Sequence, residues 1–397
     1  MISAPLPLDG ITVVAVEQAV SAPFATRQLA DLGARVIKVE RPDGGDFARG
    51  YDTKARGMAS HFVWANRGKE SLAVDLKDPR GLDAVRRLVA GADVFVQNLA
   101  QGAAARLGLD AATLCAADPR LVAVDISGYG AGGPYADKRA YDMLVQCEAG
   151  LVSVTGTEQQ PVKAGIPAAD IAAAMYAFSG VLAALLRRAN TGRGGPVEIS
   201  MLEALVEWMG HPLHHTMHGG TPPARTGLAH AVIAPYDAYP TADGRSVLLS
   251  VQNDREWRRL AEHLLERPEL GTDPAYATNA ARVARRQQTD ALVGEALGKL
   301  GAEEAVKRLD AAGIACARLR DVSEIAEHPQ LAARDRWRET GSPVGTLRTL
   351  LPPITLPGNE PVLTDVPALG EHTEALLRAV GKSDAEIAAM RRDGVIA

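Results

Sequence analysis

Two patterns alternate over about the first 130 residues, and this alternation constrains the fold more than any other feature. Runs of β-branched and apolar residues, such as Ile11–Gln18 (ITVVAVEQ) and Ser71–Leu76 (SLAVDL), have the length of buried parallel strands. Segments with helical spacing of apolar residues lie between them, and the first ends at Gly33, a residue suited to a helix C-cap. The alternation predicts an α/β fold with a doubly wound sheet.

Ligands of doubly wound sheets bind beyond the carboxyl ends of the strands. We therefore expect a functional edge that carries Gln18, Arg41, Asn98 and the loop Gly128–Gly133 (GYGAGG). This loop lacks GxGxxG spacing, and the segment after the first strand (VEQAVSAP) holds no glycine, so nicotinamide or flavin binding is not expected. We interpret the loop as an active-site turn in which glycine permits unusual backbone angles.

The composition changes near residue 221, where the chain is interrupted by Pro222, Pro223, Pro235 and Pro240. The run YPTADGRSVLLSV predicts a hairpin that turns at Ala242–Gly244, and helical patterns then continue to about Ala312. We expect a large domain over residues 1–205, a linker over 206–224 and a smaller α+β domain over 225–330. A proline-rich linker over 331–360 and a helical segment over 361–397, returning to the large domain, complete the predicted organisation.

Charge and cysteine usage limit the classes of partner and compartment. Positive and negative residues are interspersed with a formal net charge of −5, which argues against nucleic acid bound over a broad basic face. Three widely separated cysteines, Cys115, Cys147 and Cys316, predict a reduced cytoplasmic protein without a disulfide framework. The N-terminus has no signal-peptide pattern. The longest apolar run, Ile171–Leu186, falls short of the roughly 20 residues of a membrane span, so we expect a buried helix and no membrane partner.

Four histidines lie close together in the stretch HPLHHTMHGG, at His211, His214, His215 and His218. His214 and His218 are four residues apart and would share one face of a helix. A zinc site needs a further ligand, and no HExxH motif accompanies the histidines. We predict no metal site and favour partly buried or interfacial histidines, with the role of the cluster left open.

Basic residues at or just beyond strand ends are candidates for phosphate binding. Each of Arg41, Lys77, Arg106 and Arg139 alone is more typical of a solvated surface charge. Together on one sheet edge they could bind phosphates as separate charges, because the Walker lysine motif is absent. No GxSxG elbow is present, and no cysteine lies in a nucleophile motif.

Two carboxylates stand out. Asp170, in the stretch KAGIPAADIAAAMYAFSGVLAALL, is the only ionisable group between Ala164 and Leu186 apart from Tyr176. Aspartate is a favoured helix N-cap, and capping is the interpretation that the pattern alone favours. A carboxylate at a helix start is also an ionised nucleophile that needs no base at neutral pH, and the two roles are compatible. The second carboxylate, Asp142, precedes an apolar run after a basic segment.

Long blocks in register along the chain carry a resemblance to a known family. They are LDGITVVAVE, DLGARVIKVERPDGGD, NRGKESLAVDLKDPRG, ADVFVQNLAQGAAARLGLD, GYGAGGPYADKRAYDMLVQCEAGLVSVTG, GIPAADIAAAMYAFSGVLAALL, TGRGGPVEISMLEA and GIACARLRDVSEIAEHPQLAARD. In these blocks the chain resembles the family III CoA-transferases of the formyl-CoA and carnitine CoA-transferase type, which include alpha-methylacyl-CoA racemase. The resemblance implies a Rossmann-like large domain, a small domain and two chains interlocked as a homodimer.

The resemblance also implies a reaction and its residues. An aspartate matching Asp170 attacks an acyl-CoA, and an aspartyl-CoA thioester passes CoA to an acceptor carboxylate. No permanently bound cofactor is expected, because the coenzyme A thioester is a substrate. Asp142 takes a supporting role in catalysis, and Gly130 lies in the loop that is a candidate source of oxyanion donors. Positions matching CoA contacts are the backbone around Val20 and Ser21 and the side chains of Arg41, Lys77, Asn98, Arg106 and Arg139.

Departures from the family pattern reduce the number of reactions that we expect of this chain. The racemase has a histidine where this chain has Tyr141, a poor base at neutral pH, so racemisation by α-proton transfer is the alternative rather than the main hypothesis. The glycine run of formyl-CoA transferases is not evident, and the segment starting at Pro222 looks more like members acting on C4–C5 dicarboxylates such as itaconate, mesaconate, malate or succinate. Arg225 is a candidate for the distal carboxylate. A CoA-binding protein with a vestigial site is the non-enzymatic hypothesis.

Overall fold

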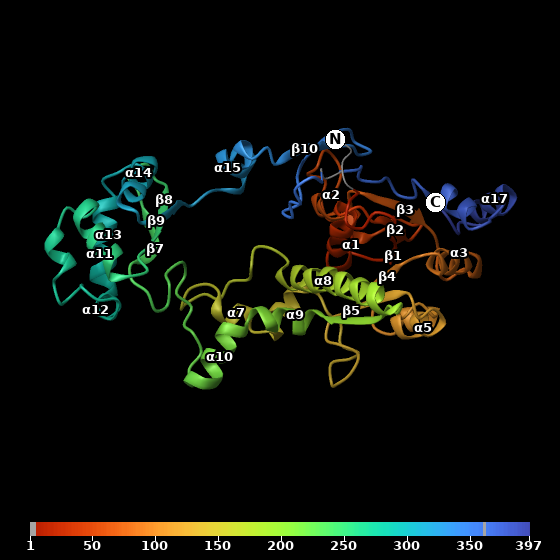
Figure 1. The fold of residues 1–397 in the computed structure, drawn as a ribbon, viewed down its shortest axis with the longest axis horizontal. Coiled ribbons are helices and arrows are strands. Elements are labelled where there is room, and N and C mark those ends of the chain that lie inside the picture. The colour runs from red at the N-terminus through yellow and green to blue at the C-terminus, as the bar shows by residue number, and fades with distance from the viewer. Residues whose placement is uncertain (1–4, 360–362) are drawn as a thin grey trace. The chain divides into compact units, whose positions relative to one another are not determined.

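The computed structural model describes residues 5–359 and 363–397 (Figure 1). The chain divides into two compact units. Unit 1 contains the described residues up to Leu151, together with Ala164–His211 and Ala333–Ala397. Unit 2 contains Val152–Lys163 and Pro212–Ala332. Both units are therefore assembled from separated stretches of the chain.

A six-stranded parallel sheet forms the centre of unit 1. Its spatial order is β3-β2-β1-β4-β5-β6, which is the strand order of doubly wound dinucleotide-binding folds. The strands are β1 Thr12–Val16, β2 Arg35–Glu40, β3 Lys69–Ala73, β4 Val94–Gln97, β5 Val122–Ser127 and β6 Gly195–Ser200. The predicted doubly wound sheet is thus confirmed. The strand expected over Ser71–Leu76 begins earlier, at Lys69, and pairs along its length with β2.

Helices cover both faces of this sheet, because alternate strand residues point to opposite faces. Val13 and Ala15 of β1 belong to a core shared with α1 and α8, whereas Val14 and Val16 belong to a core shared with α3 and the C-terminal helices. The helices between the strands are α1 Ser21–Asp31, η1 Phe47–Gly50, α2 Ser60–Asn66, α3 Pro79–Ala90, α4 Ala103–Leu107, α5 Ala111–Ala117, α6 Asp142–Glu148, α7 Leu151–Val154 and α8 Ala168–Thr191, and α9 Met201–Trp208 follows β6.

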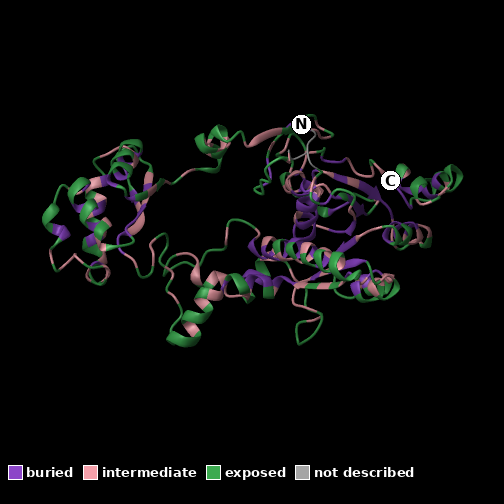
Figure 2. Ribbon diagram, in the orientation of Figure 1, coloured by how far each residue is buried: buried purple, intermediate pink, exposed green. Residues whose placement is uncertain are grey.

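The long helix α8 has one buried face and one open face (Figure 2). Alanines such as Ala169 and Ala173 are fully buried, and their small side chains allow close packing. The open face carries a stripe at helical spacing that comprises Met175, Ser179, Ala183 and Leu186. By length and composition α8 would suffice to cross a membrane, which the shorter apolar run in the sequence did not predict. Its buried face nevertheless packs in the core of unit 1, as core helices do.

Unit 2 contains a three-stranded antiparallel sheet in the order β7-β8-β9. β7 Tyr236–Pro240 and β8 Ser246–Ser250 form the predicted hairpin, and Gly244 adopts the φ of +76° that its turn requires. Trp257 is fully buried in the core beneath this sheet. The helices are α10 Gly210–Gly219, α11 Asp254–His263, η2 Pro268–Gly271, α12 Asn279–Ala284, α13 Arg286–Leu297, α14 Ala302–Ala312, η3 Val322–Glu327 and α15 Pro329–Ala333, and the third strand is β9 Ala315–Arg318.

The last stretch of the chain completes unit 1. A small hairpin, β10 Trp337–Thr340 with β11 Leu347–Leu350, lies within the range that the sequence predicted as the second linker. Two helices follow, α16 Thr373–Ala379 and α17 Asp384–Arg392, within the range of the predicted C-terminal segment. Beyond α17, Ile396 bridges Val74 next to the edge strand β3. The C-terminal residues therefore continue the edge of the central sheet.

Candidate active site

Asp170 lies in the first turn of α8, the helix that connects β5 with β6. A crossover helix between parallel strands starts near their carboxyl ends, so Asp170 lies at the edge where such sheets bind ligands. Its side chain is only partly accessible. The N-cap position belongs to Pro167, which makes no side-chain cap, and Asp170 lies inside the helix. The prediction that Asp170 itself caps the helix was therefore wrong.

Asp142 supplies the missing cap from another helix. Its Oδ1 accepts hydrogen bonds from the backbone amides of Ala169 (2.8 Å) and Asp170 (3.2 Å). Its Oδ2 accepts a 2.6 Å bond from Gln146, one turn further along α6. Gln146 is fully buried and accepts a bond from the amide of Ala164. Asp142 and Gln146 thus hold the segment that leads into α8.

The environment of Asp170 favours the neutral form of its carboxyl group. Burial raises the pKa of Asp170 to about 7, the negative charge of Asp142 adds to this increase, and hydrogen bonds from the side chain and backbone of Ser21 oppose it. This environment opposes the full ionisation at neutral pH that the sequence pattern suggested. A perturbed carboxyl group at a ligand-binding edge is a typical sign of a functional site.

The turn after β1 brings Ser21 to Asp170, and Asn98 holds this turn. Asn98 Oδ1 accepts from the amide of Gln18 (2.8 Å), and Asn98 Nδ2 donates to the Gln18 carbonyl (2.8 Å) and to Ser21 Oγ (3.1 Å). Val20 and Ser21 are both buried. The polar atoms of the Asn98 amide are thus engaged by the turn, and Asn98 acts on this part of the site through its neighbours.

Each of the four predicted phosphate-binding cations follows a strand of the parallel sheet. Arg41 comes after β2, Lys77 after β3, Arg106 lies in α4 after β4, and Arg139 lies in the loop after β5. All four are exposed, and Arg41 donates to the carbonyl of Gly45 (3.2 Å). Since the four strands are parallel members of one sheet, with β1 between β2 and β4, the four cations follow the same edge of the sheet. Their contact with CoA stays a prediction.

In the glycine-rich loop, the amide of Gly130 already has an acceptor. Gly130 has a φ of +90°, and its amide already donates to Ser127 Oγ (2.9 Å). Further along, the ammonium group of Lys138 lies 4.0 Å from the ring centre of Tyr135. Tyr141, at the racemase histidine position, precedes α6 and is 65% exposed.

Tyr51 lies within the electrostatic reach of Asp170, and the sequence did not point to it. Its pKa is raised to about 12 by burial and by the negative charges of Asp46 and Asp170, so the phenol lies in the field of the candidate nucleophile. Its ring packs edge-on against His61 with 5.4 Å between the ring centres. A single tyrosine in an irregular loop gives no sequence signal, and only the fold brings it near Asp170.

In unit 2, Arg225 is engaged by backbone groups. Its guanidinium donates to the carbonyls of Thr157 (2.9 Å), Glu158 (3.0 Å) and Ser153 (3.3 Å). These bonds hold the loop of residues 153–158, and binding of a distal carboxylate by Arg225 stays a prediction.

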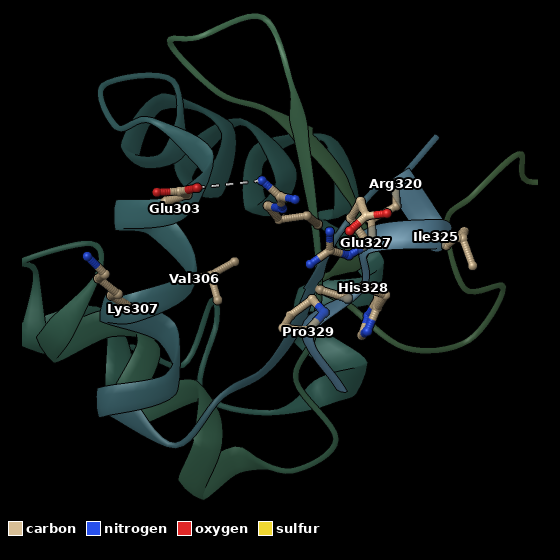
Figure 3. Close-up of a pocket in the computed structure, with 10 residues that line it drawn as sticks. Glu303, Val306, Lys307, Arg320, Ile325, Glu327, His328 and Pro329 are labelled. Atoms are coloured by element: carbon tan, nitrogen blue, oxygen red, sulfur yellow. Dashed lines mark ion pairs between the residues drawn. The ribbon is translucent and has the colours of Figure 1, made fainter. Parts of the chain in front are cut away.

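A pocket of about 730 Å³ in unit 2 carries several charges but none of the predicted site residues (Figure 3). Arg318 lines it and forms a 3.0 Å ion pair with Glu324, and its other guanidinium nitrogen lies 3.8 Å from Glu303. The pocket is lined by Glu303, Val306, Lys307, Ala317, Arg318, Arg320, Ile325, Glu327, His328 and Pro329.

The histidines of α10 stack rather than converge. The rings of His214 and His218 lie 5.5 Å apart at an angle of 14°. Within residues 5–359 and 363–397, no group of three or more His, Cys, Asp or Glu side chains is placed to hold a metal ion.

Comparison with known proteins assigns the family. The sequence model of CoA-transferase family III matches residues 8–373. A succinate–glutarate CoA-transferase from Agrobacterium fabrum is 35% identical over 94% of this chain and 95% of its own length. A formyl-CoA:oxalate CoA-transferase from Streptomyces avermitilis is 32% identical over 98% of this chain and 99% of its own.

Solved structures agree with this assignment. The crystal structure of a CAIB/BAIF family protein from Brucella suis superposes with a TM-score of 0.85 at 32% identity, covering 95% of this chain and 100% of that one. The match extends over both units rather than over the parallel sheet alone. The chain with Asp170 at the start of α8 belongs to CoA-transferase family III, and it is an enzyme that transfers CoA between carboxylic acids.

Proposed function

We propose that this enzyme transfers CoA from an acyl-CoA such as succinyl-CoA to a C4–C5 dicarboxylate, with Asp170 as the covalent nucleophile. The observation that carries the proposal is the half-buried Asp170 carboxyl, bonded to Ser21 and placed beside the capped start of α8. The dicarboxylate class is supported by the succinate–glutarate relative, and glutarate therefore joins the candidates itaconate, mesaconate and malate.

The proposed reaction conserves the thioester bond. An oxygen of ionised Asp170 attacks the thioester carbonyl, the C–S bond breaks, and CoA leaves as a thiolate with a mixed anhydride on the enzyme. The thiolate then attacks the aspartyl carbonyl, which releases the donor acid as a carboxylate and forms an aspartyl-CoA thioester. The acceptor carboxylate repeats these two steps in reverse order, giving its own CoA thioester and free Asp170. No net proton is taken up or released.

The pKa of Asp170 links this chemistry to pH. Only the ionised carboxyl attacks, so kcat/KM should rise with pH through the pKa of about 7 and level off above it. The raised pKa also makes the carboxylate a more basic nucleophile once it is ionised. The interactions with Ser21 preferentially stabilise this charged form.

Racemisation remains the alternative, and the site gives it less support. The residue at the histidine position, Tyr141, has an exposed phenol, and Asp142 is engaged in the α8 cap and the bond to Gln146. A racemase would exchange the α-proton of a 2-methylacyl-CoA with D₂O in the absence of an acceptor acid. Deuterium entry without acid-dependent CoA exchange would favour this alternative.

A homodimer forms part of the proposal. The stripe on α8 leaves Met175 and Leu186 exposed at 36% and 65%, and Trp208 of α9 is 49% exposed. Large apolar side chains gathered on neighbouring helices are typical of surfaces that a second chain covers. We assign this surface to a second copy. The three free cysteines support the proposed cytoplasmic location.

The decisive experiment traps the intermediate. The enzyme is mixed with succinyl-CoA and glutarate, CoA esters are followed by mass spectrometry, and hydroxylamine captures any aspartyl thioester as a hydroxamate on the peptide containing Asp170. We expect glutaryl-CoA and a labelled Asp170 in the native enzyme, and a loss of at least about 10³-fold in Asp170→Ala. Asp310→Asn, an exposed carboxylate of unit 2, is the matched control.

The panel of acceptors extends to itaconate, mesaconate, malate and oxalate. No exchange with any acid together with no hydroxamate on Asp170 would refute the proposal. CoA binding that persists in Asp170→Ala, with no catalytic activity in either protein, would instead indicate the vestigial-site hypothesis.

A further inference from the structure

The turn between β1 and α1 contains a strained residue beside the nucleophile. Ala19 has a φ of +61°, a left-handed conformation that side chains with a Cβ rarely adopt. The residue after next is Ser21, which bonds Asp170. Such a conformation persists only where surrounding groups hold it, and it is often found at functional sites. The contacts that hold Ala19 therefore bear on the position of Asp170's partner.

Asp46 holds Ala19 directly. Its Oδ1 accepts from the amide of Ala19 (3.0 Å) and from the amide of Ala48 (2.9 Å). Asp46 is the N-cap of η1 and is 2% exposed. One buried carboxylate thus joins the turn after β1 to the segment after β2, two segments of the same sheet edge. Its other oxygen, Oδ2, accepts a 2.8 Å bond from Lys38.

Lys38 connects Asp46 to the end of strand β1. Its ammonium group is completely buried and also contacts the backbone carbonyl and Oε1 of Glu17, both at 3.4 Å. Glu17 is the residue that directly follows β1. Lys38 therefore bridges Asp46, which bonds Ala19, and Glu17, which lies between the end of β1 and the turn. A buried ammonium between two carboxylates gives a fixed, directional support.

Lys69 provides a second support under the start of α1. Its buried ammonium group donates to Glu17 Oε1 (2.6 Å), Asn66 Oδ1 (3.0 Å) and the carbonyl of Pro23 (2.9 Å). Pro23 belongs to the first turn of α1, so Lys69 fixes the helix at the point where the turn enters it. Through Glu17, this second support is continuous with the first.

We propose that Glu17, Lys38, Asp46 and Lys69, here called the ion cluster, act as positioning residues for CoA transfer. The cluster holds the Ala19 amide and the first turn of α1, so that Ser21 stays bonded to Asp170. Asp46 is the member that acts most directly, because it alone of the four bonds the strained residue. The inference rests on the proposed role of Asp170 and extends it to residues that do not touch the substrate.

The test of position is amide hydrogen exchange of the peptide containing Gln18–Ser21. Asp46→Ala removes the acceptor and the ion pair, and we expect exchange in this turn to accelerate at least about tenfold. Asp46→Asn keeps one acceptor oxygen and the side-chain shape, so we expect a smaller acceleration. Asp52→Ala is the matched control, because Asp52 also accepts from two backbone amides, those of Lys54 and Ser60, outside the cluster.

The test of function separates chemistry from binding. We expect kcat of Asp46→Asn to fall about tenfold with KM for the acyl-CoA within about threefold, because a displaced positioning group affects the reacting geometry more than substrate binding. The yield of hydroxamate on Asp170 in a single turnover should fall in parallel. If Asp46→Ala does not fold, Asp46→Asn and Lys38→Met provide the same measurements.

Distinct results separate the outcomes. A variant with a lower melting temperature but native exchange in the turn and native kcat would show that the cluster only stabilises the fold, and would overturn the inference. Faster exchange with unchanged hydroxamate formation would also overturn it. If native enzyme forms no hydroxamate at all, the proposed function fails, and the exchange data still decide whether Asp46 holds Ala19.

Discussion

The starts of α1 and α8 meet at the candidate nucleophile, and they are held in related ways. Neither helix has a side-chain cap from its own N-cap residue, which is Val20 in α1 and Pro167 in α8. In both cases a carboxylate from a distant part of the chain bonds the backbone, Asp46 at the turn before α1 and Asp142 at the first turn of α8. Both helix starts are therefore fixed by tertiary contacts.

The two starts differ in how their charges are balanced. Below α1, Asp46 is buried and faces Lys38, so each charge has an opposite partner. At α8, burial raises the pKa of Asp170, and the negative charge of the nearby Asp142 raises it further, without an opposite charge among the described residues to offset them. The region with paired charges supports the turn before α1, and the region without an opposite charge contains the candidate nucleophile.

Among the substitutions that test this comparison, removal of the α8 cap should change the measured property most, through a loss of kcat. In Asp142→Ala the amides of Ala169 and Asp170 lose their acceptor, and we expect kcat to fall about 100-fold through misplacement of the nucleophile. Steady-state kinetics with succinyl-CoA would measure it. Glu148→Ala is the control, since it lies on the same helix and pairs with Lys138 instead. A native rate in Asp142→Ala would mean that the cap has no positioning role.

Replacing the Asp170 carboxyl by a neutral amide should stabilise the folded protein at high pH. The pKa of Asp170 is raised from 3.8 to about 7, so the native state holds a proton that the unfolded state loses, and stability falls as pH rises through this window. Asp170→Asn should therefore be more stable than the native protein at pH 8 by about 1–3 kcal/mol, and similar to it near pH 3. Denaturant titrations at both pH values test the sign, and equal differences at both would contradict it.

The open face of α8 offers a third contrast, since most residues of α1 are buried. Leu186→Asp places a charge in the exposed apolar stripe, and we expect the dimer dissociation constant to rise at least about tenfold. Sedimentation equilibrium would measure it. Val322→Asp, an 86% exposed position of unit 2, serves as the control. An unchanged dissociation constant would remove the stripe from the proposed interface.

The smallest effect should come from a substitution that removes the charge of Asp142 but keeps its hydrogen bond to the start of α8. Asp142→Asn retains an oxygen for the Ala169 amide but no longer repels the ionised Asp170 carboxylate. The rising limb of kcat/KM, expected near pH 7 in the native enzyme, should move to lower pH with little change in the plateau. An unmoved limb would show that burial alone raises the pKa of Asp170.

Much of the fold was predictable because its determinants are local. The alternation of strand and helix patterns predicted the parallel sheet, and long blocks in register predicted the family. The supports of the site were not predictable in this way, because Asp46 acts on Ala19 and Asp142 acts on Ala169, and each pair is 27 residues apart in the sequence. A sequence pattern can identify a capping residue only when that residue adjoins the helix in the sequence. The pattern therefore assigned the cap of α8 to Asp170.

Unit 1 also constrains the order in which the chain can fold during synthesis. Residues 333–397 belong to it, and Val395 accepts a bond from the amide of Asp75 beside the edge strand β3. The ribosome makes the whole of unit 2 before this last stretch emerges. The central sheet of the unit that contains Asp170 is therefore incomplete at one edge while unit 2 is translated. A nascent-chain protease assay should find unit 2 resistant first.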